Sequence, residues 1–180
     1  MVVLKRMKNK NKKVKLLPVK PFQETLGGGY CGPASLKMVL DYFGEVHSEE
    51  EIARRCKRDP ELGTNDIALA KAARSYGFDV VIKNNSTFTN LNQWLKKGAP
   101  VIVNWFTRGR SDYDDSEVPD GHYSVVVGLD EKNIYLQDPE IGALRKIERE
   151  DFLRVWFDFA GRYIKPNQLI IRQIIAIYKK

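Results

Sequence analysis

Cys31 lies where a glycine-rich loop leads into a predicted helix, and this position suits a nucleophilic thiol. Gly27–Gly29 come just before it, and glycine accepts backbone conformations that other residues avoid. Pro33 is tolerated in the first turn of a helix, where its missing N–H would have had no partner. The positive end of the helix dipole stabilises a thiolate, which is the nucleophilic form of cysteine. The alternative is a small buried cysteine that only packs.

A thiol nucleophile needs a base, and the base needs an acceptor that orients it. The chain has two histidines. His47 lies in a turn beside acidic residues, which favours a surface role, whereas His122 begins a predicted strand. Asp138 ends the next predicted strand, and a hairpin turn at 130–133 places it a few residues from the direct partner of His122. The alternatives are a structural histidine and an aspartate that opens a turn before proline.

Gln23, eight residues before Cys31, is the candidate oxyanion donor. Attack on a carbonyl creates an oxyanion that needs hydrogen-bond donors around it. The Gln23 amide and the Cys31 backbone N–H supply two. A glutamine alone is uninformative, so this assignment depends on the other three residues.

The second cysteine, Cys56, shares a predicted helix face with Ile52, which favours a packing role. Two cysteines are too few for a disulfide framework, and the pattern fits a reducing compartment. No spacing of cysteine and histidine resembles a zinc site. We therefore expect no metal and no cofactor.

Hydrophobic periodicity changes between the two halves of the chain. The first half predicts a helix over 32–43, a short one opened by a capping box at Ser48, a third capped by Thr64 or Asn65, and a fourth capped by Thr89 or Asn90. A short strand over 78–82 lies between the third and fourth. The second half predicts a helix over 150–157, a polar loop over 107–120, and strands over 100–106, 122–129, 134–137, 144–147 and 169–178. Helices followed by an antiparallel sheet indicate an α+β domain.

The net charge of +7 is concentrated at the N-terminus. Residues 1–20 hold eight lysines and arginines and no acid, so residues 21–180 carry a net charge of −1. We expect a basic, flexible arm over 1–20 and a single domain over 21–180. Such an arm can contact nucleic acid, whereas the domain carries no nucleic-acid signal.

No apolar run is long enough to span a membrane, and lysines interrupt the N-terminus before a signal peptide can form. We therefore expect a cytoplasmic protein without a transmembrane segment. The sequence does not specify an oligomeric state.

Three ordered motifs carry a resemblance to a known superfamily. They are Gln23 followed by YCGPASL at 30–36, GHYSVVVG at 121–128, and YLQDP at 135–139. From about residue 22 to residue 157 the chain resembles the papain-like cysteine peptidases. Within them it is most similar to the bacteriocin-processing (double-glycine leader) peptidases and their stand-alone relatives. The resemblance implies a helical N-terminal half packed on an antiparallel C-terminal sheet, with the site between them.

By residue match, the resemblance makes Cys31 the nucleophile, His122 the general base and then acid, Asp138 its orienting partner and Gln23 the oxyanion donor. It implies a cysteine peptidase that cleaves a peptide bond near small residues through a thioester, with a peptide or protein as substrate. The best-known members are fused to membrane transporters. The alternative function is a catalytically silent peptide-binding module of the same fold.

Overall fold

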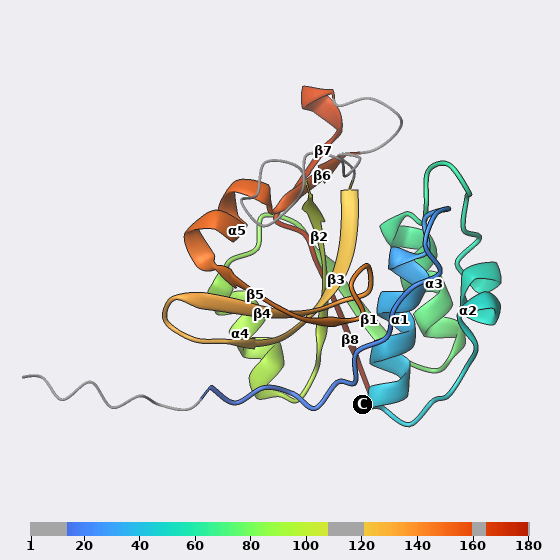
Figure 1. Ribbon diagram of the computed structural model, residues 1–180, viewed down its shortest axis with the longest axis horizontal. Helices are drawn as coiled ribbons and strands as arrows, with labels where there is room; N and C mark the ends of the chain where they lie inside the picture. Colours follow the sequence, from blue (N-terminus) through green and yellow to red (C-terminus); the bar gives the residue numbers. More distant parts are fainter. Residues whose placement is uncertain (1–13, 108–120, 160–164, 180) are drawn as a thin grey trace, which may run out of the picture.

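The computed structural model of the chain describes residues 14–107, 121–159 and 165–179. The predicted polar loop, apart from Thr107, and residues 1–13 of the predicted arm lie outside these ranges. The model has helices packed against a mostly antiparallel sheet (Figure 1). The predicted α+β class is therefore confirmed.

The described residues form five α-helices, which lie in two groups on either side of the main sheet (Figure 1). The first group is α1 (Cys31–Tyr42), α2 (Glu49–Arg55) and α3 (Asp66–Ser75), and the second is α4 (Phe88–Lys96) and α5 (Arg149–Val155). None of these helices in the described ranges is long and apolar enough to cross a membrane.

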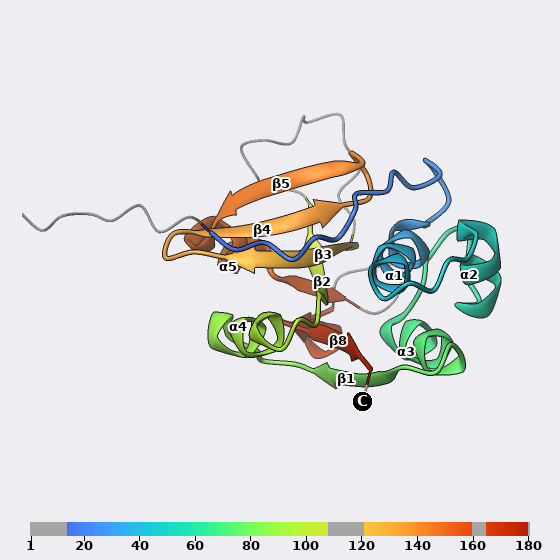
Figure 2. The ribbon, with the colours of Figure 1, turned by 90° about the horizontal axis from the view of Figure 1, so that it is seen from below.

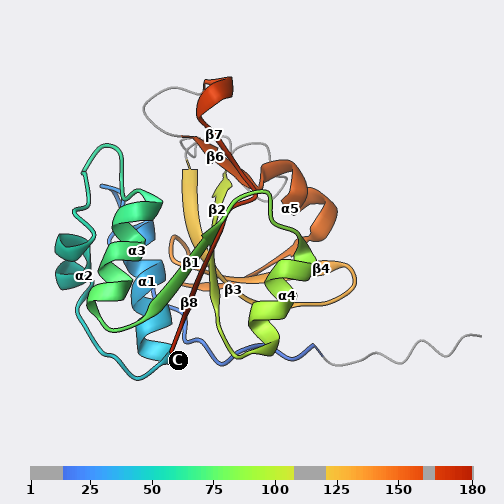
Figure 3. The same cartoon turned by 180° about the vertical axis from the view of Figure 1, so that it is seen from behind.

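The main sheet has six antiparallel strands in the order β1-β8-β2-β3-β4-β5, and it is strongly curved (Figure 2). The strands are β1 (Asp79–Lys83), β2 (Val101–Phe106), β3 (Gly121–Leu129), β4 (Asn133–Asp138), β5 (Ala143–Glu148) and β8 (Ile174–Tyr178). Seen from behind, β1 and β8 pass between α3 and α4 (Figure 3).

Two hydrophobic cores explain the nearly continuous apolar runs of the central strands. Ile102 and Val125 face the core under α1–α3, whereas their neighbours Val101, Val103 and Val126 face the core under α4 and α5. A strand that is covered on both faces needs apolar residues at every position rather than at alternate ones. The sheet therefore separates the two groups of helices and supports both.

The C-terminal part differs from its prediction in two places. The helix predicted over 150–157 ends at Val155, because Phe157 starts a strand and stacks on Phe106 with ring centroids 5.1 Å apart. The strand predicted over 169–178 is divided, because Arg172 adopts a positive φ of 46°. The first piece, β7 (Leu169–Ile171), pairs with β6 (Phe157–Phe159) in a separate two-stranded sheet. A short 3-10 helix, Pro166–Gln168, precedes β7.

Four of the five predicted helix starts were close, and one was misplaced. Ser48 and Asn65 accept hydrogen bonds from the N–H groups of Glu51 and Ala68, as expected of capping residues. The fourth helix starts earlier than predicted, because Thr87, not Thr89 or Asn90, is its N-cap. Thr87 and Asn90 exchange side-chain to backbone hydrogen bonds in a capping box.

Residues 14–20, which charge alone assigns to a flexible arm, run along the sheet (dark blue in Figure 1). The Leu17 N–H donates to the Val127 carbonyl at 2.8 Å, and Gln137 Nε2 donates to the Val19 carbonyl at 2.8 Å. Val19 is buried, and Leu16 occupies the space that a side chain at Gly128 would need. The packed domain therefore begins before residue 20. The same contacts fix the segment that leads to Gln23.

Candidate active site

Cys31 is the first residue of α1 and is half-buried. Tyr30 occupies the N-cap position without a side-chain capping bond, and the first turn contains no acid. The N–H groups of this turn and the helix dipole therefore act on the thiol without a competing anion from the turn itself. Gly32 allows Thr64 and Tyr123 to pack closely beside the cysteine, since a Cβ there would lie 3.1 Å from the Cβ of Thr64.

The glycine-rich loop before Cys31 is fastened to α2 and to the segment that follows α2. Gly27, Gly28 and Gly29 have φ values of 77°, 99° and 72°, a backbone region that favours glycine. Thr25 donates to Glu49 at 2.7 Å, and Tyr30 donates to Glu50 at 3.1 Å. The Arg58 guanidinium lies 4.0 Å from the centre of the Tyr30 ring and donates to the Gly28 carbonyl. These anchors were not foreseen from the sequence.

His122, near the start of β3, is buried between the cysteine and an aspartate. Its Nε2 lies 2.8 Å from Asp138 Oδ1. The Cys31 thiol lies close enough to the same ring to contribute to raising its pKa. Trp105 contacts the ring edge-to-face at 5.5 Å and is itself held by a bond from its Nε1 to Ser124 Oγ. Contacts with Asp138 and Trp105 therefore fix the imidazole.

Opposing influences set the charges of this pair. Burial disfavours the charged imidazole, but the Asp138 carboxylate and the Cys31 thiol outweigh burial and raise the pKa of His122 well above 6.5. Burial likewise opposes ionisation of Asp138, yet His122 and Arg145 lower the pKa of that carboxyl below its usual range. An imidazolium beside a carboxylate is therefore the favoured state at neutral pH.

Asp138 has a second cationic partner that sequence reasoning missed. Arg145 Nε donates to Asp138 Oδ2 at 2.6 Å, and the Glu140 N–H donates to Oδ1 at 3.1 Å. The sequence did contain one signal for this partner. Arg145 is a charged residue on the same face of β5 as the buried Ile147. Such a residue needs a buried partner of opposite charge.

Gln23 reaches the site through the turn between β4 and β5. Its Nε2 hydrogen-bonds the Glu140 carbonyl at 3.4 Å, and the next residue, Glu24, donates its N–H to the Pro139 carbonyl at 2.9 Å. Gly142, with φ of 59°, lies so close to the Gln23 backbone that a Cβ would not fit. The turn that follows Asp138 thus also anchors Gln23. The Gln23 amide bonds to this turn, while His122 and Asp138 contact each other directly.

Glu24 is a further acid at the site that the sequence did not single out. Its Oε2 is buried without a hydrogen-bond partner. Burial raises the pKa of Glu24 from 4.5 to about 7; His122 opposes this rise, and the acids Glu140, Asp138 and Glu49 add to it. Near neutral pH this carboxyl is therefore divided between its protonated and ionised forms.

Replacing Glu24 by glutamine is expected to flatten the pH dependence of stability. The folded state binds the Glu24 proton more tightly than the unfolded state, so the wild-type free energy of unfolding falls as pH rises from 4.5 through about 7. After allowance for partial solvent screening, we expect the wild-type free energy of unfolding to fall by about 1–2 kcal/mol over this pH range. Glu24→Gln should not show this fall. Urea unfolding at pH 5 and pH 8 measures it, with exposed Glu131→Gln as the control. Parallel wild-type and Glu24→Gln curves would contradict the prediction.

The remaining histidine and cysteine lie outside this arrangement. His47 pairs with Glu51 at 3.2 Å, and its ring contacts Tyr76 with centroids 4.3 Å apart. Cys56 is fully buried, and burial raises the pKa of its thiol to about 12. Both residues therefore lie in environments typical of a structural role.

One group of side chains in the described ranges has the proximity that a metal ion needs. The ligand atoms of His122, Asp138 and Glu140 lie within 4.8 Å of one another. However, Arg145 occupies Asp138 Oδ2 and lies 3.9 Å from the Glu140 carboxylate. A cation there would meet the guanidinium, so the group fits a chain of ion pairs better than a metal centre.

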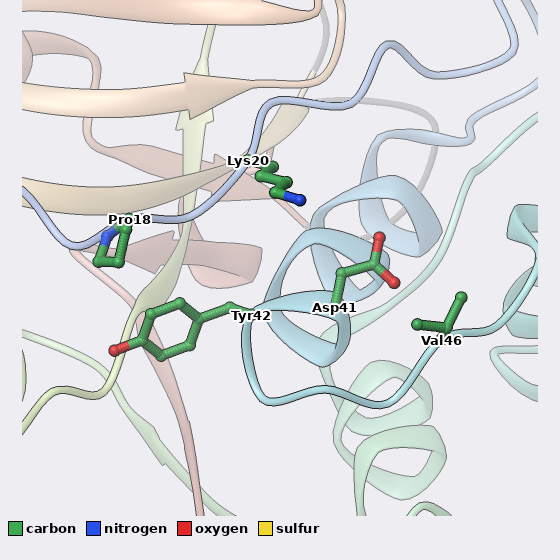
Figure 4. Close-up of a pocket in the computed structure, with 5 residues that line it drawn as sticks. All are labelled: Pro18, Lys20, Asp41, Tyr42 and Val46. Atoms are coloured by element: carbon green, nitrogen blue, oxygen red, sulfur yellow. The ribbon is translucent and has the colours of Figure 1, made fainter.

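A pocket of about 370 Å³ lies at the other end of α1 (Figure 4). It is lined by Pro18, Lys20, Asp41, Tyr42 and Val46. Cys31 begins α1 and Tyr42 ends it, which separates them by about 16 Å at 1.5 Å per residue. This pocket is therefore distinct from the site around the thiol.

Residues 8–164 match the model of the Peptidase_C39 like family. The chain belongs to this family. The resemblance inferred from the three motifs is thereby confirmed.

Two relatives illustrate the range of proteins that share the C39-like sequence. An uncharacterized protein of Methanothermobacter thermautotrophicus is 33% identical over 126 residues, which cover 70% of this chain and 75% of that protein. The transport/processing ATP-binding protein ComA of Streptococcus pneumoniae is 30% identical over 128 residues, 70% of this chain but 16% of ComA. This chain therefore corresponds to a small part of that relative.

Solved structures of C39 peptidases share the fold. The peptidase domain of Streptococcus ComA, a bi-functional ABC transporter, is 20% identical with a TM-score of 0.65, covering 90% of this chain and 99% of that domain. A double glycine motif protease from an AMS/PCAT transporter, in complex with the leader peptide, is 26% identical with a TM-score of 0.59, covering 93% of both chains.

Proposed function

We propose that this protein is a cysteine peptidase whose nucleophile is Cys31, with His122 as general base and acid and Asp138 as its orienting partner. The observation that carries this proposal is the buried pair of His122 and Asp138, with 2.8 Å between His122 Nε2 and Asp138 Oδ1. The Cys31 thiol contributes to raising the pKa of the same imidazole. A nucleophile, a base and an orienting acceptor in hydrogen-bond contact are what thiol catalysis requires.

The reaction proceeds in two halves. The Cys31 thiolate attacks the peptide carbonyl, and the His122 imidazolium gives its proton to the departing amine as the C–N bond breaks, which leaves a thioester. The neutral imidazole then takes a proton from water as the water oxygen attacks the thioester. The C–S bond breaks, the carboxylic acid product leaves, and the Cys31 thiolate beside the His122 imidazolium is restored. The Cys31 N–H and the Gln23 amide donate to the oxyanion in both halves.

The substrate class that fits best is a peptide whose scissile bond follows small residues. Membership of the C39-like family and the likeness to a double glycine motif protease bound to its leader peptide support this class. The match to ComA covers 16% of that protein, so the proposal concerns peptide cleavage alone. The alternative is a peptide-binding module that does not cleave.

Synthetic peptides test the proposal directly. A peptide with Gly-Gly before the scissile bond is expected to be cut after the second glycine, whereas a Val-Val version is not, as judged by mass spectrometry. Cys31→Ala should slow cleavage by at least about 1000-fold, and Cys56→Ala, which alters a buried packing residue, should retain activity. Peptide that binds and stays intact with wild-type protein would favour the binding module. Cleavage that survives Cys31→Ala would refute the assigned nucleophile.

A further inference from the structure

Asp138 is a fully buried carboxylate held between two cationic side chains. His122 approaches Oδ1 at 2.8 Å and Arg145 Nε approaches Oδ2 at 2.6 Å. The Asp138 side chain has no exposed surface, and that of Arg145 is 11% exposed. An ionised carboxylate in such a place is costly unless its charge is paired and hydrogen-bonded. Asp138 thus depends on both partners.

The sheet fixes Arg145 in this place. On β5, Ala143 pairs with Asp138 and Arg145 pairs with Leu136. Since every second residue of a strand points to the same face, Arg145 lies diagonally across from Asp138 on one face of the sheet. Glu140 Oε2 lies 3.9 Å from Nη2 of the same guanidinium. Arg145, fixed by the strand register and by Glu140, therefore has little freedom to move away from the Asp138 carboxylate.

The two cationic partners differ in one respect that matters for a reaction. An arginine stays charged at every accessible pH, whereas His122 loses its positive charge when it gives its proton to the leaving amine. At that stage Arg145 would be the remaining cation beside the buried Asp138 among the residues that the structure describes. A carboxylate that took up a proton or turned away at this point would no longer orient the ring for the second half of the reaction.

We propose that Arg145 is a positioning residue, which holds Asp138 ionised and in place while the His122 ring changes its protonation state. The inference rests on the proposed peptidase function. Arg145 acts through Asp138, so its charge matters more than its shape. The charged and titratable groups around Asp138 are His122 on β3, Arg145 on β5, Glu140 in the turn, Glu24 on the N-terminal segment and, beyond the ring, Cys31 on α1.

Three substitutions separate charge from shape. Arg145→Met removes the charge and keeps much of the side-chain bulk, Arg145→Gln keeps a hydrogen-bond donor without charge, and Arg145→Lys keeps the charge. Arg154→Met is the matched control, because Arg154 forms an exposed ion pair with Asp151 on α5. Should Arg145→Met fail to fold, Arg145→Gln answers the same question.

We expect Arg145→Met and Arg145→Gln to lower kcat for the Gly-Gly peptide by about 10- to 100-fold, the range for a hydrogen bond to a charged group, with KM changed by less than about threefold. The acid limb of the kcat profile should move to higher pH, because loss of a nearby cation raises the pKa of every group that must lose a proton. Arg145→Lys should keep kcat within about fivefold and leave the limb in place. If Arg145 had only a structural role, its replacement would not move the acid limb of the kcat profile.

A second readout needs no substrate. The NMR titration of the imidazole signals should place the His122 midpoint at higher pH in Arg145→Met than in wild type, while His47 stays unchanged as the internal reference. If wild type cleaves no peptide, the peptidase proposal fails, yet this titration still tests Arg145. An unmoved His122 midpoint would overturn the inference, as would wild-type kinetics in Arg145→Met or a loss in Arg145→Lys equal to that in Arg145→Met.

Discussion

Replacing His122 with alanine is expected to abolish the rapid alkylation of Cys31 by iodoacetamide below pH 7. The reactive form of the thiol is the thiolate, and an unassisted cysteine loses its proton near pH 8.5. With the imidazolium beside it, Cys31 should react at pH 6, and His122→Ala should slow that reaction by about 100-fold. Peptide cleavage should fall by at least about 1000-fold, because the same ring serves as base and acid.

The chain supplies matched controls for this experiment. Cys56 is fully buried, and its pKa is raised to about 12, so label on Cys56 reports unfolding rather than reactivity. His47→Ala removes the other histidine, which pairs with Glu51 on α2, and should leave alkylation of Cys31 unchanged. The fold should survive His122→Ala, because Asp138 keeps its bond to Arg145. A wild-type Cys31 that reacts like a free thiol, with or without His122, would contradict the proposed pair.

The contact between His122 and Asp138 could be anticipated because hairpin register follows from the position of the turn. The predicted register placed the partner of His122 near residue 141. A register shift between Val126 and Gly128 moves the pairing by one residue, so that Val125 lies opposite Gln137. This shift brings the end of β4 nearer to His122 than the simple count did. The simple count therefore placed Asp138 farther from His122 along the strands than it is.

Other parts of the site depend on contacts that local pattern does not encode. The Arg145–Asp138 ion pair requires β5 to lie beside β4 in one register, and a single inward charge in an otherwise ordinary strand does not name its partner. Residues 14–20 were assigned to an arm because of their charge, whereas their backbone hydrogen bonds and the buried Val19 decide their place. Tertiary packing also decided where α5 ends, since the Phe157 ring stacks on Phe106.

The turn between β4 and β5 links two site residues that are far apart in sequence. It begins at Asp138, and through Pro139, Glu140 and Gly142 it holds the segment that contains Gln23. The proposed orienting acid and the proposed oxyanion donor therefore move together if this turn moves. The close approach of Gly142 to Gln23 explains why a residue with a side chain would not suit this position.

Asp138→Asn is expected to reduce both stability and activity. The substitution leaves Arg145 and His122 without the carboxylate that pairs them, and breaking a buried ion pair by removing one partner costs about 3–5 kcal/mol of unfolding free energy. The His122 pKa should fall, because burial opposes the charged ring once its anion is gone. The neutral ring would also lack the acceptor that selects its tautomer, so cleavage should fall by about 1000- to 10,000-fold.

The pH dependence of this stability loss separates a charge effect from a packing effect. The pKa of Asp138 is lowered in the folded state, so its stabilising contribution is complete above the ordinary carboxyl pKa and disappears as pH falls through the folded value. His122 contributes in the opposite sense, since its raised pKa stabilises the fold below 6.5 and that contribution fades as pH rises through the folded value. Urea unfolding of wild type and Asp138→Asn should therefore differ most between about pH 5 and 6.5 and converge on strong acidification. A constant difference at every pH would mean that Asp138 fills space in the core rather than holding a charge for His122.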